Sequence, residues 1–329
     1  MNAVIETRKL TKRFGRARGI VDVDMQVEEG EVFGFIGPNG AGKSTTIRTL
    51  LSLIRKTSGE ARIFGLDCER DSTRILADVG YLPSEVFYYD RMRAIDLLNY
   101  SASFYKKDCN QRIRELSEVL ELDLNRKIED MSLGNKKKVG IVQGLLHSPR
   151  LIILDEPTSG LDPLMQKTFF ELIRQENKRG ATVFFSSHIL GEVQRICDRV
   201  AIIKEGRIVD TQSIAALQQT AVKRVTLIAK NPVMPASLIF PGVAAVEVDG
   251  VHASFVYEGD CNVLLAKLSD LPLANIDITE PTLEEVFLHY YSDDIAQNVI
   301  TGSSGSKPKD DEAVLVGKSS PSASRASGR

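Results

Sequence analysis

The sequence predicts an α/β protein built on a parallel sheet, and two segments carry this prediction. The apolar run Val32 to Ile36 is followed at once by the glycine-rich stretch Gly37 to Thr45, an order typical of strand, loop and helix. A second run, Leu151 to Leu154, has four consecutive aliphatic residues and fits a strand that is buried on both faces. Because two acidic residues follow this second run, we expect a binding site at that edge of the sheet.

The glycine-rich stretch is a candidate phosphate-binding loop. It consists of Gly37, Pro38, Asn39, Gly40, Ala41, Gly42, Lys43, Ser44 and Thr45. Glycines at the spacing G-x-x-x-x-G-K-[ST] allow successive backbone N–H groups to turn toward nucleotide phosphates, and the helix that follows adds its positive dipole end. In this pattern Lys43 supplies a positive charge to the outer phosphates, and the Ser44 hydroxyl is a ligand for Mg²⁺. The sequence therefore predicts a nucleoside triphosphate site.

The length and composition allow two domains and a tail. The chain has 329 residues with 42 basic and 44 acidic side chains, so the net charge indicates neither a nucleic-acid partner nor a polybasic membrane anchor. The four cysteines are far apart in the chain, which favours reduced thiols over a zinc site or a disulfide framework. We expect no signal peptide, because Met1 to Arg8 has charges where an apolar segment would be needed, and no membrane span, because no apolar run of about 18 residues occurs.

Two half-buried strands are expected before the loop, at residues 3–10 and 20–27, because apolar residues alternate there. Between them, Leu10 to Gly15 is expected to be a turn region. Its aromatic residue, Phe14, either stacks on a nucleotide base or fills core space. Taken alone, the core interpretation of Phe14 is favoured.

After the loop, residues 91–147 carry apolar positions at helical spacing, so an all-helical insert is expected to interrupt the α/β pattern. Ser132 stands in the N-cap position of its last helix. The run Lys136 to Lys138 is expected to be a solvated face rather than a binding patch. The other expected elements are a helix at 44–53, a strand pair around 61–64, and strands at 79–82, 182–187, 200–204 and 207–209.

Asp155 and Glu156 directly follow the second aliphatic run, at the strand end where open α/β sheets bind their ligands. Next to a phosphate loop, Asp155 is expected to hold Mg²⁺ through water, and Glu156 to accept a proton from the water that attacks the terminal phosphate. His188 follows the buried strand at 182–187 and is expected at the same sheet edge, although a lone histidine is more often structural.

In their order along the chain, these motifs resemble the nucleotide-binding subunit of an ABC (ATP-binding cassette) transporter, and the resemblance covers residues 3 to about 215. It implies that Gly37 to Thr45 are the Walker A loop, and that Leu151 to Glu156 are Walker B with Glu156 as the catalytic glutamate. It also implies that Phe14 stacks on adenine and that His188 is the switch histidine, which contacts the γ-phosphate. The stretch Ser159 to Asp162 resembles the D-loop of the family.

Two motifs depart from the family pattern. The signature, usually Leu-Ser-Gly-Gly-Gln, reads Met131 to Asn135 here, with Ser132 and Gly134 retained to grip the γ-phosphate of ATP in the opposite subunit. Leu133 is expected to limit close approach of the backbone. Ser84 stands where the family has its Q-loop glutamine, so a weak contact to Mg²⁺ and slow turnover are expected, with Glu85 or water making up the gap.

We expect residues 1–218 to form the nucleotide-binding domain, with the helical insert at about 86–147, followed by a small α+β domain at 219–298 and a disordered tail at 299–329. The small domain is similar to the C-terminal appendage on ATPase subunits of bacterial ABC-2 type exporters. A regulatory or dimer-supporting role and a plain structural cap both stay open for it. Its expected elements are strands at 225–229, 243–248, 253–257 and 276–279, a helix at 262–268, and a last helix opened by Pro281 to Glu285, where Thr282 and Glu285 have capping-box spacing.

The resemblance implies a subunit that binds and hydrolyses ATP with Mg²⁺. Two such subunits, identical or different, would close on two ATP molecules and drive a separate integral membrane permease from the cytoplasmic face of the membrane. The C-terminal appendage implies export of a drug, peptide, lipid or ion. One alternative is a soluble cassette ATPase in translation or DNA repair, which commonly carries two cassettes or a long coiled coil. The other is a phosphate-loop switch outside the family, which would leave Ser132 and Ser159 to Asp162 without a purpose.

Overall fold

The computed structural model describes residues 3–15, 17–89, 91–218 and 222–279, and its centre is a six-stranded sheet. The strand order is β10-β9-β3-β8-β7-β6, in which β9, β3, β8, β7 and β6 run parallel and β10 is antiparallel to β9. These strands are β3 (Val32–Ile36), β6 (Val79–Leu82), β7 (Leu151–Asp155), β8 (Thr182–Ser187), β9 (Arg199–Lys204) and β10 (Arg207–Ser213). The α/β fold class predicted from the sequence is confirmed.

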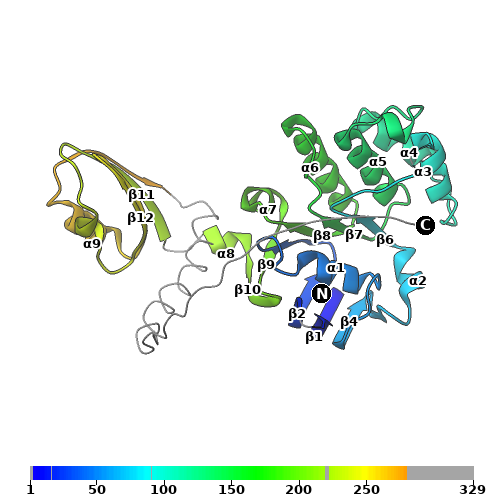
Figure 1. Cartoon of the computed structure of the whole chain (residues 1–329), viewed down its shortest axis with the longest axis horizontal. Coiled ribbons are helices and arrows are strands. Elements are labelled where there is room, and N and C mark those ends of the chain that lie inside the picture. The colour runs from blue at the N-terminus through cyan, green and yellow to red at the C-terminus, as the bar shows by residue number, and fades with distance from the viewer. Residues whose placement is uncertain (1–2, 16, 90, 219–221, 280–329) are drawn as a thin grey trace, which may run out of the picture. The chain divides into compact units, whose positions relative to one another are not determined.

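Three neighbouring strands of this sheet, β3, β8 and β7, are buried along their whole length. Helices and a second sheet cover the two faces (Figure 1), which explains why these strands are continuous apolar runs rather than alternating ones. The register pairs Ile36 with Ser187 and Asp155 with Ser186. The loops that follow β3, β7 and β8 therefore begin side by side at one edge of the sheet.

The second sheet is antiparallel, with the order β2-β1-β4-β5. Its strands are β1 (Ala3–Phe14), β2 (Ala17–Glu28), β4 (Ser58–Ile63) and β5 (Leu66–Asp67). The expected turn from Leu10 to Gly15 was wrong, because β1 continues to Phe14, which pairs with Ala17. Register shifts on both sides of Leu10 break the apolar alternation, so the strand predicted from this alternation ended too early.

Helices lie on both faces of the central sheet (Figure 1). Helix α1 (Lys43–Leu50) lies on the side of the antiparallel sheet, and α5 and α6 lie on the other. Helix α1 ends earlier than the expected Leu53, because the N–H groups of Leu53 and Ile54 both bond back to the Arg48 carbonyl. The other helices among residues 3–218, outside the insert, are α2 (Ser72–Leu76), α6 (Pro163–Lys178), α7 (Leu190–Ile196) and α8 (Ile214–Gln218).

The helical insert contains α3 (Ala94–Ala102), α4 (Asn110–Val119), the short 3₁₀ turn Ile128–Asp130 and α5 (Leu133–Leu145). Ser132 is the N-cap of α5 as predicted, since its Oγ accepts from the Asn135 N–H at 3.3 Å. Helix α5 packs directly on β6. A Cβ added to Gly80 would lie 2.1 Å from the Gly144 carbonyl oxygen, so only glycine allows this approach of helix to strand.

The C-terminal domain has a four-stranded antiparallel sheet in the order β12-β13-β11-β14. Its elements are β11 (Val222–Ala229), a 3₁₀ turn at Pro235–Leu238, β12 (Val243–Asp249), β13 (His252–Glu258), α9 (Cys261–Leu268) and β14 (Leu273–Thr279). Its own core includes Leu227, Phe255 and Leu264. The expected last helix from Pro281 and the expected tail lie outside the described residues. Across the described ranges, no helix is both long and apolar enough to cross a bilayer.

His147 links the insert to the central sheet through a buried ring. Its Nε2 lies 3.2 Å from the Val79 carbonyl oxygen of β6, and the ring stacks on Tyr105 with 3.9 Å between centroids. Burial, helped by the positive charge of Lys107, lowers the pKa of His147 from 6.5 to about 4. The folded protein therefore holds this histidine uncharged at neutral pH.

We predict that His147 makes the protein less stable in acid. The unfolded chain binds a proton near pH 6.5 and the folded chain only near pH 4, so this contribution to stability is complete above pH 6.5 and is lost as the pH falls toward 4. Between about pH 7.5 and about pH 5, the free energy of unfolding measured with urea should fall by roughly 2 kcal/mol more in the wild type than in His147→Phe. The phenylalanine ring can stack on Tyr105 but does not titrate. Equal losses in the two proteins would contradict the prediction.

Candidate functional site

The predicted phosphate loop connects β3 to α1 and is packed tightly between neighbouring strands. Gly42 caps α1 with a left-handed backbone at φ 114°, and a Cβ there would lie 2.8 Å from the Ile20 side chain. A Cβ on Gly37 would lie 2.3 Å from the Ile203 carbonyl oxygen of β9. Beside the loop is a cavity of about 220 Å³, lined by Gly19, Asn39, Gly40, Gly42, Lys43, Ser44, Thr45, Ser84 and Glu156. Predicted residues from three separate segments thus share one cavity, together with Gly19, which the sequence analysis missed.

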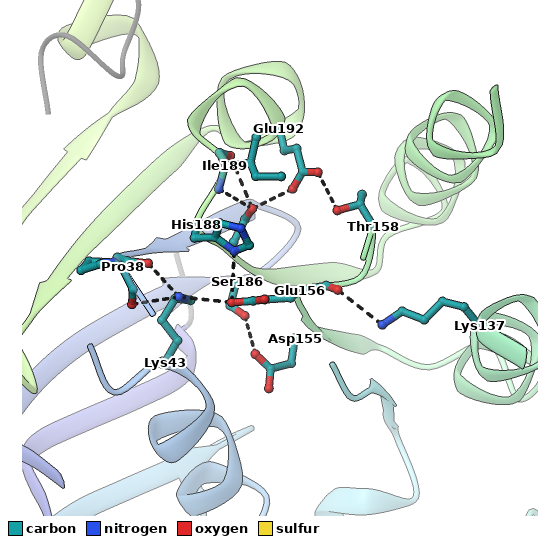
Figure 2. A network of polar contacts seen from close by, with 12 residues as sticks. Pro38, Lys43, Lys137, Asp155, Glu156, Thr158, Ser186, His188, Ile189 and Glu192 are labelled. Carbon is teal, nitrogen blue, oxygen red and sulfur yellow. Dashed lines mark hydrogen bonds and ion pairs between the residues drawn. The ribbon is translucent and has the colours of Figure 1, made fainter. Parts of the chain in front are cut away.

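Lys43 and Glu156 line this cavity, and His188 lies against Glu156 (Figure 2). The buried Lys43 Nζ donates to the Gly37 carbonyl oxygen at 2.7 Å and to that of Pro38 at 3.2 Å, and lies 3.3 Å from Glu156 Oε1. His188 Nδ1 lies 3.3 Å from the same Glu156 oxygen. The arrangement therefore offers a positive charge, a carboxylate that can accept a proton, and an imidazole at one point.

Asp155 is fully buried beside this cluster and has an oxygen suited to a cation. Its Oδ1 accepts from Ser186 Oγ at 2.8 Å, whereas its buried Oδ2 has no hydrogen-bond partner. Such an atom is uncommon, since nearly all buried polar atoms are paired, and carboxylate oxygen is a preferred ligand of Mg²⁺. Asp155 and the cavity-lining Ser44 hydroxyl therefore fit a Mg²⁺ site. Within the described residues, no cluster of three or more His, Cys, Asp or Glu could hold a metal on its own.

Phe14 lies at the end of β1 with its ring 43% exposed, so it does not fill the core as one alternative expected. Lys12 Nζ lies 5.0 Å from the ring centroid. In the described part of the chain, Phe14 is not among the residues that line the phosphate cavity, whereas Gly19, after the same hairpin turn, is. Stacking of Phe14 on the base stays a prediction.

Ser132 and Gly134 lie at the N-terminus of α5, where Ser132 and Leu133 are exposed to solvent. Leu133 packs beside the D-loop, because a Cβ added to Gly160 would lie 3.2 Å from its Cδ2. Asp162 then caps α6 by accepting from the Met165 N–H at 2.9 Å. The contact of Ser132 and Gly134 with a nucleotide of another subunit stays a prediction.

The prediction that Lys136 to Lys138 form a solvated face was wrong for Lys137, which is only 1% exposed. Its Nζ donates to the carbonyl oxygens of Ser84 at 2.9 Å, Pro83 at 3.1 Å and Glu156 at 3.4 Å. Burial lowers the pKa of Lys137 to about 8, and the negative charges of Asp155 and Glu156 act in the opposite direction. A signal was present, because Lys137 shares one face of α5 with the buried Ile141 and Gly144.

A second buried network, also missed in the sequence, holds the segment around His188. Glu192 of α7 accepts from Thr158 Oγ1 at 2.5 Å and from Ser187 Oγ at 2.7 Å. Ser187 Oγ in turn accepts from the Ile189 N–H at 2.9 Å (Figure 2). Both neighbours of His188 are thereby tied to one carboxylate, which also holds the loop after Glu156. The position of Glu192, four residues after His188, was the available signal.

An apolar groove of about 460 Å³ lies beside the loop that follows β6. Aromatic residues from this loop and from α3 and its C-terminal end line it, among them Phe87, Tyr89, Tyr100 and Phe104. These four side chains are exposed, and Phe87 most of all at 85%. Pro83 lines this groove, and the next residue, Ser84, lines the phosphate cavity.

The fold and the cavity define a phosphate-loop α/β protein, and comparison with known proteins gives its family. The family model described as ABC transporter matches residues 20–159. The bacitracin transport ATP-binding protein BcrA of Bacillus licheniformis is 39% identical over 213 residues, which cover 64% of this chain and 70% of BcrA. The linearmycin resistance ATP-binding protein LnrL of Bacillus subtilis is 28% identical over 305 residues, which cover 87% of this chain and 97% of LnrL.

A solved structure of an ATP-binding subunit of an ABC transporter matches with a TM-score of 0.62 and 29% identity, over 66% of this chain and 92% of that one. A dimeric ATP-binding cassette with bound ADP and Pi, at 23% identity and a TM-score of 0.59, shares the fold over 64% of this chain and 98% of its own. The chain belongs to the ABC transporter family as an ATP-binding subunit. The family resemblance in its motifs is thereby confirmed.

We predict that Glu192→Ala destabilises the protein, because it leaves the buried hydroxyls of Thr158 and Ser187 without their shared acceptor. An unpaired buried group costs about 1–3 kcal/mol, and Ser187 Oγ keeps only its bonds to Ile189, so the free energy of urea unfolding should fall by at least about 1 kcal/mol. The matched control is Glu171→Ala on the exposed side of α6, which should stay within about 0.5 kcal/mol of the wild type. Equal stabilities of the two variants would argue against a structural role for this network.

Proposed function

We propose that this chain hydrolyses ATP and drives a separate membrane permease from the cytoplasmic face of the membrane. The observation that carries this proposal is that Lys43 and Glu156 line the cavity beside the phosphate loop and that both Lys43 and His188 lie within 3.3 Å of the Glu156 carboxylate. A loop that only bound nucleotide would not need a carboxylate and an imidazole directed at the same point. Membership of the ABC transporter family supplies the substrate, ATP.

In the proposed reaction, backbone N–H groups of the loop and the Lys43 ammonium hold the phosphates of ATP. Glu156 accepts a proton from the attacking water while the bond between the β–γ bridging oxygen and the γ-phosphorus breaks, giving ADP and inorganic phosphate. His188 lies 3.3 Å from Glu156 and orients this carboxylate toward the γ-phosphate. Ser44 and, through water, Asp155 would hold Mg²⁺, whose charge would help to neutralise the phosphates. Ser84 lines the same cavity and would add a weak contact to Mg²⁺.

Two subunits, either identical or different, form the working unit in this proposal. Each ATP is held by the phosphate loop of one subunit and by Ser132 and Gly134 of the other. Support comes from the exposed N-terminus of α5, where a backbone dipole end and a serine hydroxyl face solvent. ATP drives closure because it binds the closed pair more tightly than the open one. The C-terminal domain supports this dimer.

The apolar groove beside Ser84 is the proposed docking site for a helix of the permease. Its exposed aromatic side chains suit an apolar helix face, and the same loop runs from the groove into the phosphate cavity. Movement at the nucleotide can thus reach the permease through residues 84–93. We propose export of a drug, peptide, lipid or ion, since the match to LnrL extends beyond the cassette and two relatives are named for bacitracin transport and linearmycin resistance.

Glu156→Gln should abolish turnover but keep ATP binding, because the amide occupies the same place and cannot take the proton. We expect phosphate release to fall by at least about 100-fold and an ATP-dependent dimer to accumulate in size-exclusion chromatography. Lys43→Ala is the companion variant, and it should lose ATP binding itself. Hydrolysis by Glu156→Gln at the parental rate would remove Glu156 from its assigned role.

Phe87→Asp should weaken docking to the permease without changing hydrolysis by the free subunit. A charge placed at the most exposed aromatic side chain of the groove opposes burial against an apolar helix. On co-expression with the permease, we expect the membrane-bound fraction of the subunit to fall by at least about fivefold. The control is Leu53→Asp, also at an exposed apolar residue but outside the groove. Retention of Phe87→Asp at the wild-type level would contradict the docking site.

A further inference from the structure

Lys137 lies between the N-terminus of α5 and the main chain of Glu156, two parts of the chain that the proposed function uses at different nucleotides. It lies on α5, one turn after Ser132 and Gly134, which the proposed function directs at the ATP of the opposite subunit. Its side chain extends the other way, into its own subunit, and reaches the main chain at Glu156 (Figure 2). One helix therefore carries residues proposed to contact the nucleotide of the opposite subunit and a lysine that contacts the main chain of Glu156 in its own subunit.

The three hydrogen bonds of Lys137 match the three donors of an ammonium group. Its acceptors are the carbonyl oxygens of Ser84 at 2.9 Å, Pro83 at 3.1 Å and Glu156 at 3.4 Å. Burying a cation is costly unless it is hydrogen-bonded, and here backbone oxygens do this rather than a carboxylate partner. Because all three acceptors belong to the main chain, Lys137 holds the paths of two loops relative to α5.

The main chain of Glu156 needs such support. Glu156 has a left-handed backbone with φ 48°, which residues other than glycine rarely adopt and which surrounding contacts must maintain. Its N–H donates to the Ser186 carbonyl oxygen at 3.1 Å, and its own carbonyl accepts from Lys137. The Ser159 N–H also donates to this carbonyl at 3.4 Å, so Lys137 acts together with the turn that follows Glu156. These bonds hold the residue from both sides and so direct its carboxylate toward Lys43 and His188.

We propose that Lys137 is a positioning residue for ATP hydrolysis, which ties the signature helix α5 to the backbone of Ser84 and of Glu156 in the same subunit. The inference rests on the proposed function, in which Glu156 is the general base. Contact of α5 with nucleotide in the opposite subunit is thereby linked to the placement of the base at the subunit's own nucleotide. A lysine that only attached the insert to the sheet would affect stability but not the chemical step.

The test is Lys137→Met, which keeps the length and packing of the stem and removes the three donors. We expect kcat for ATP to fall by at least about tenfold, while KM and the Kd for ATP stay within about twofold of the wild type. ATP affinity is retained because, in the described part of the chain, Lys137 is not among the residues that line the phosphate cavity. Lys138→Met, the partly exposed next residue of α5, is the control and should keep the parental kcat.

Hydrogen exchange gives a second readout that a purely structural role would not produce. In Lys137→Met, amides at 84–86 and 156–159 should exchange faster, while those of the phosphate loop and of β6 and β7 stay protected as in the wild type. A parental kcat in Lys137→Met would overturn the inference. A fall in kcat that accompanies an equal loss of ATP affinity, or faster exchange throughout the insert and the sheet, would also overturn it.

If Lys137→Met fails to fold, Lys137→Leu takes its place under the same criteria, since it also removes all three donors. A reduced kcat with unchanged KM supports the inference, and a parental kcat overturns it. Failure of the proposed function is recognised separately, because then the wild type releases no phosphate from ATP or Glu156→Gln hydrolyses at the parental rate. If wild type and Glu156→Gln behave as proposed and Lys137→Met is unaffected, only the role of Lys137 is wrong.

Discussion

The parallel pairing of β3, β8 and β7 is the constraint on which the site depends. Its register places Ile36 beside Ser187 and Asp155 beside Ser186, so the phosphate loop, the acidic pair and His188 all begin at one sheet edge. The strands can be buried on both faces because most of their residues are apolar, and the polar residues at the ends of β7 and β8 include Asp155 and Ser186, which are hydrogen-bonded to each other. The polar chemistry is therefore confined to the loops that follow, where a cavity is available.

Sequence patterns predicted the parts of this arrangement that depend on local order. The aliphatic runs, the glycine-rich loop and the acids after Leu154 each lie within a few residues, and the structure shows all of them where they were expected. The turn expected at Leu10 was wrong, because register shifts with the neighbouring strands interrupt the alternation. Lys137 and Glu192 were missed for a related reason. Both are charged residues on helices, and only tertiary contacts with loops distant in sequence make them buried.

The departures from the family signature and Q-loop lie close to these buried charges. Ser84 brings a short hydroxyl to the cavity, and its carbonyl is fastened to α5 by Lys137. Leu133 replaces a glycine and lies against Gly160 of the D-loop. Two loops that contact nucleotide in the proposed mechanism are thus attached to the first turns of one helix. In this chain, α5 contacts the loops at the nucleotide site through the side chains of Lys137 and Leu133.

The contact between Gly80 of β6 and Gly144 of α5 limits how the insert can move. A helix backbone that touches a strand backbone, without side chains between them, has no soft layer that could shear or be compressed. Rotation of the insert must therefore leave this point nearly still and displace α3 and α4 the most. A small rearrangement at the nucleotide would then be enlarged with distance from a fixed pivot, so the wall of the aromatic groove on α3 would move relative to the wall at Gly144.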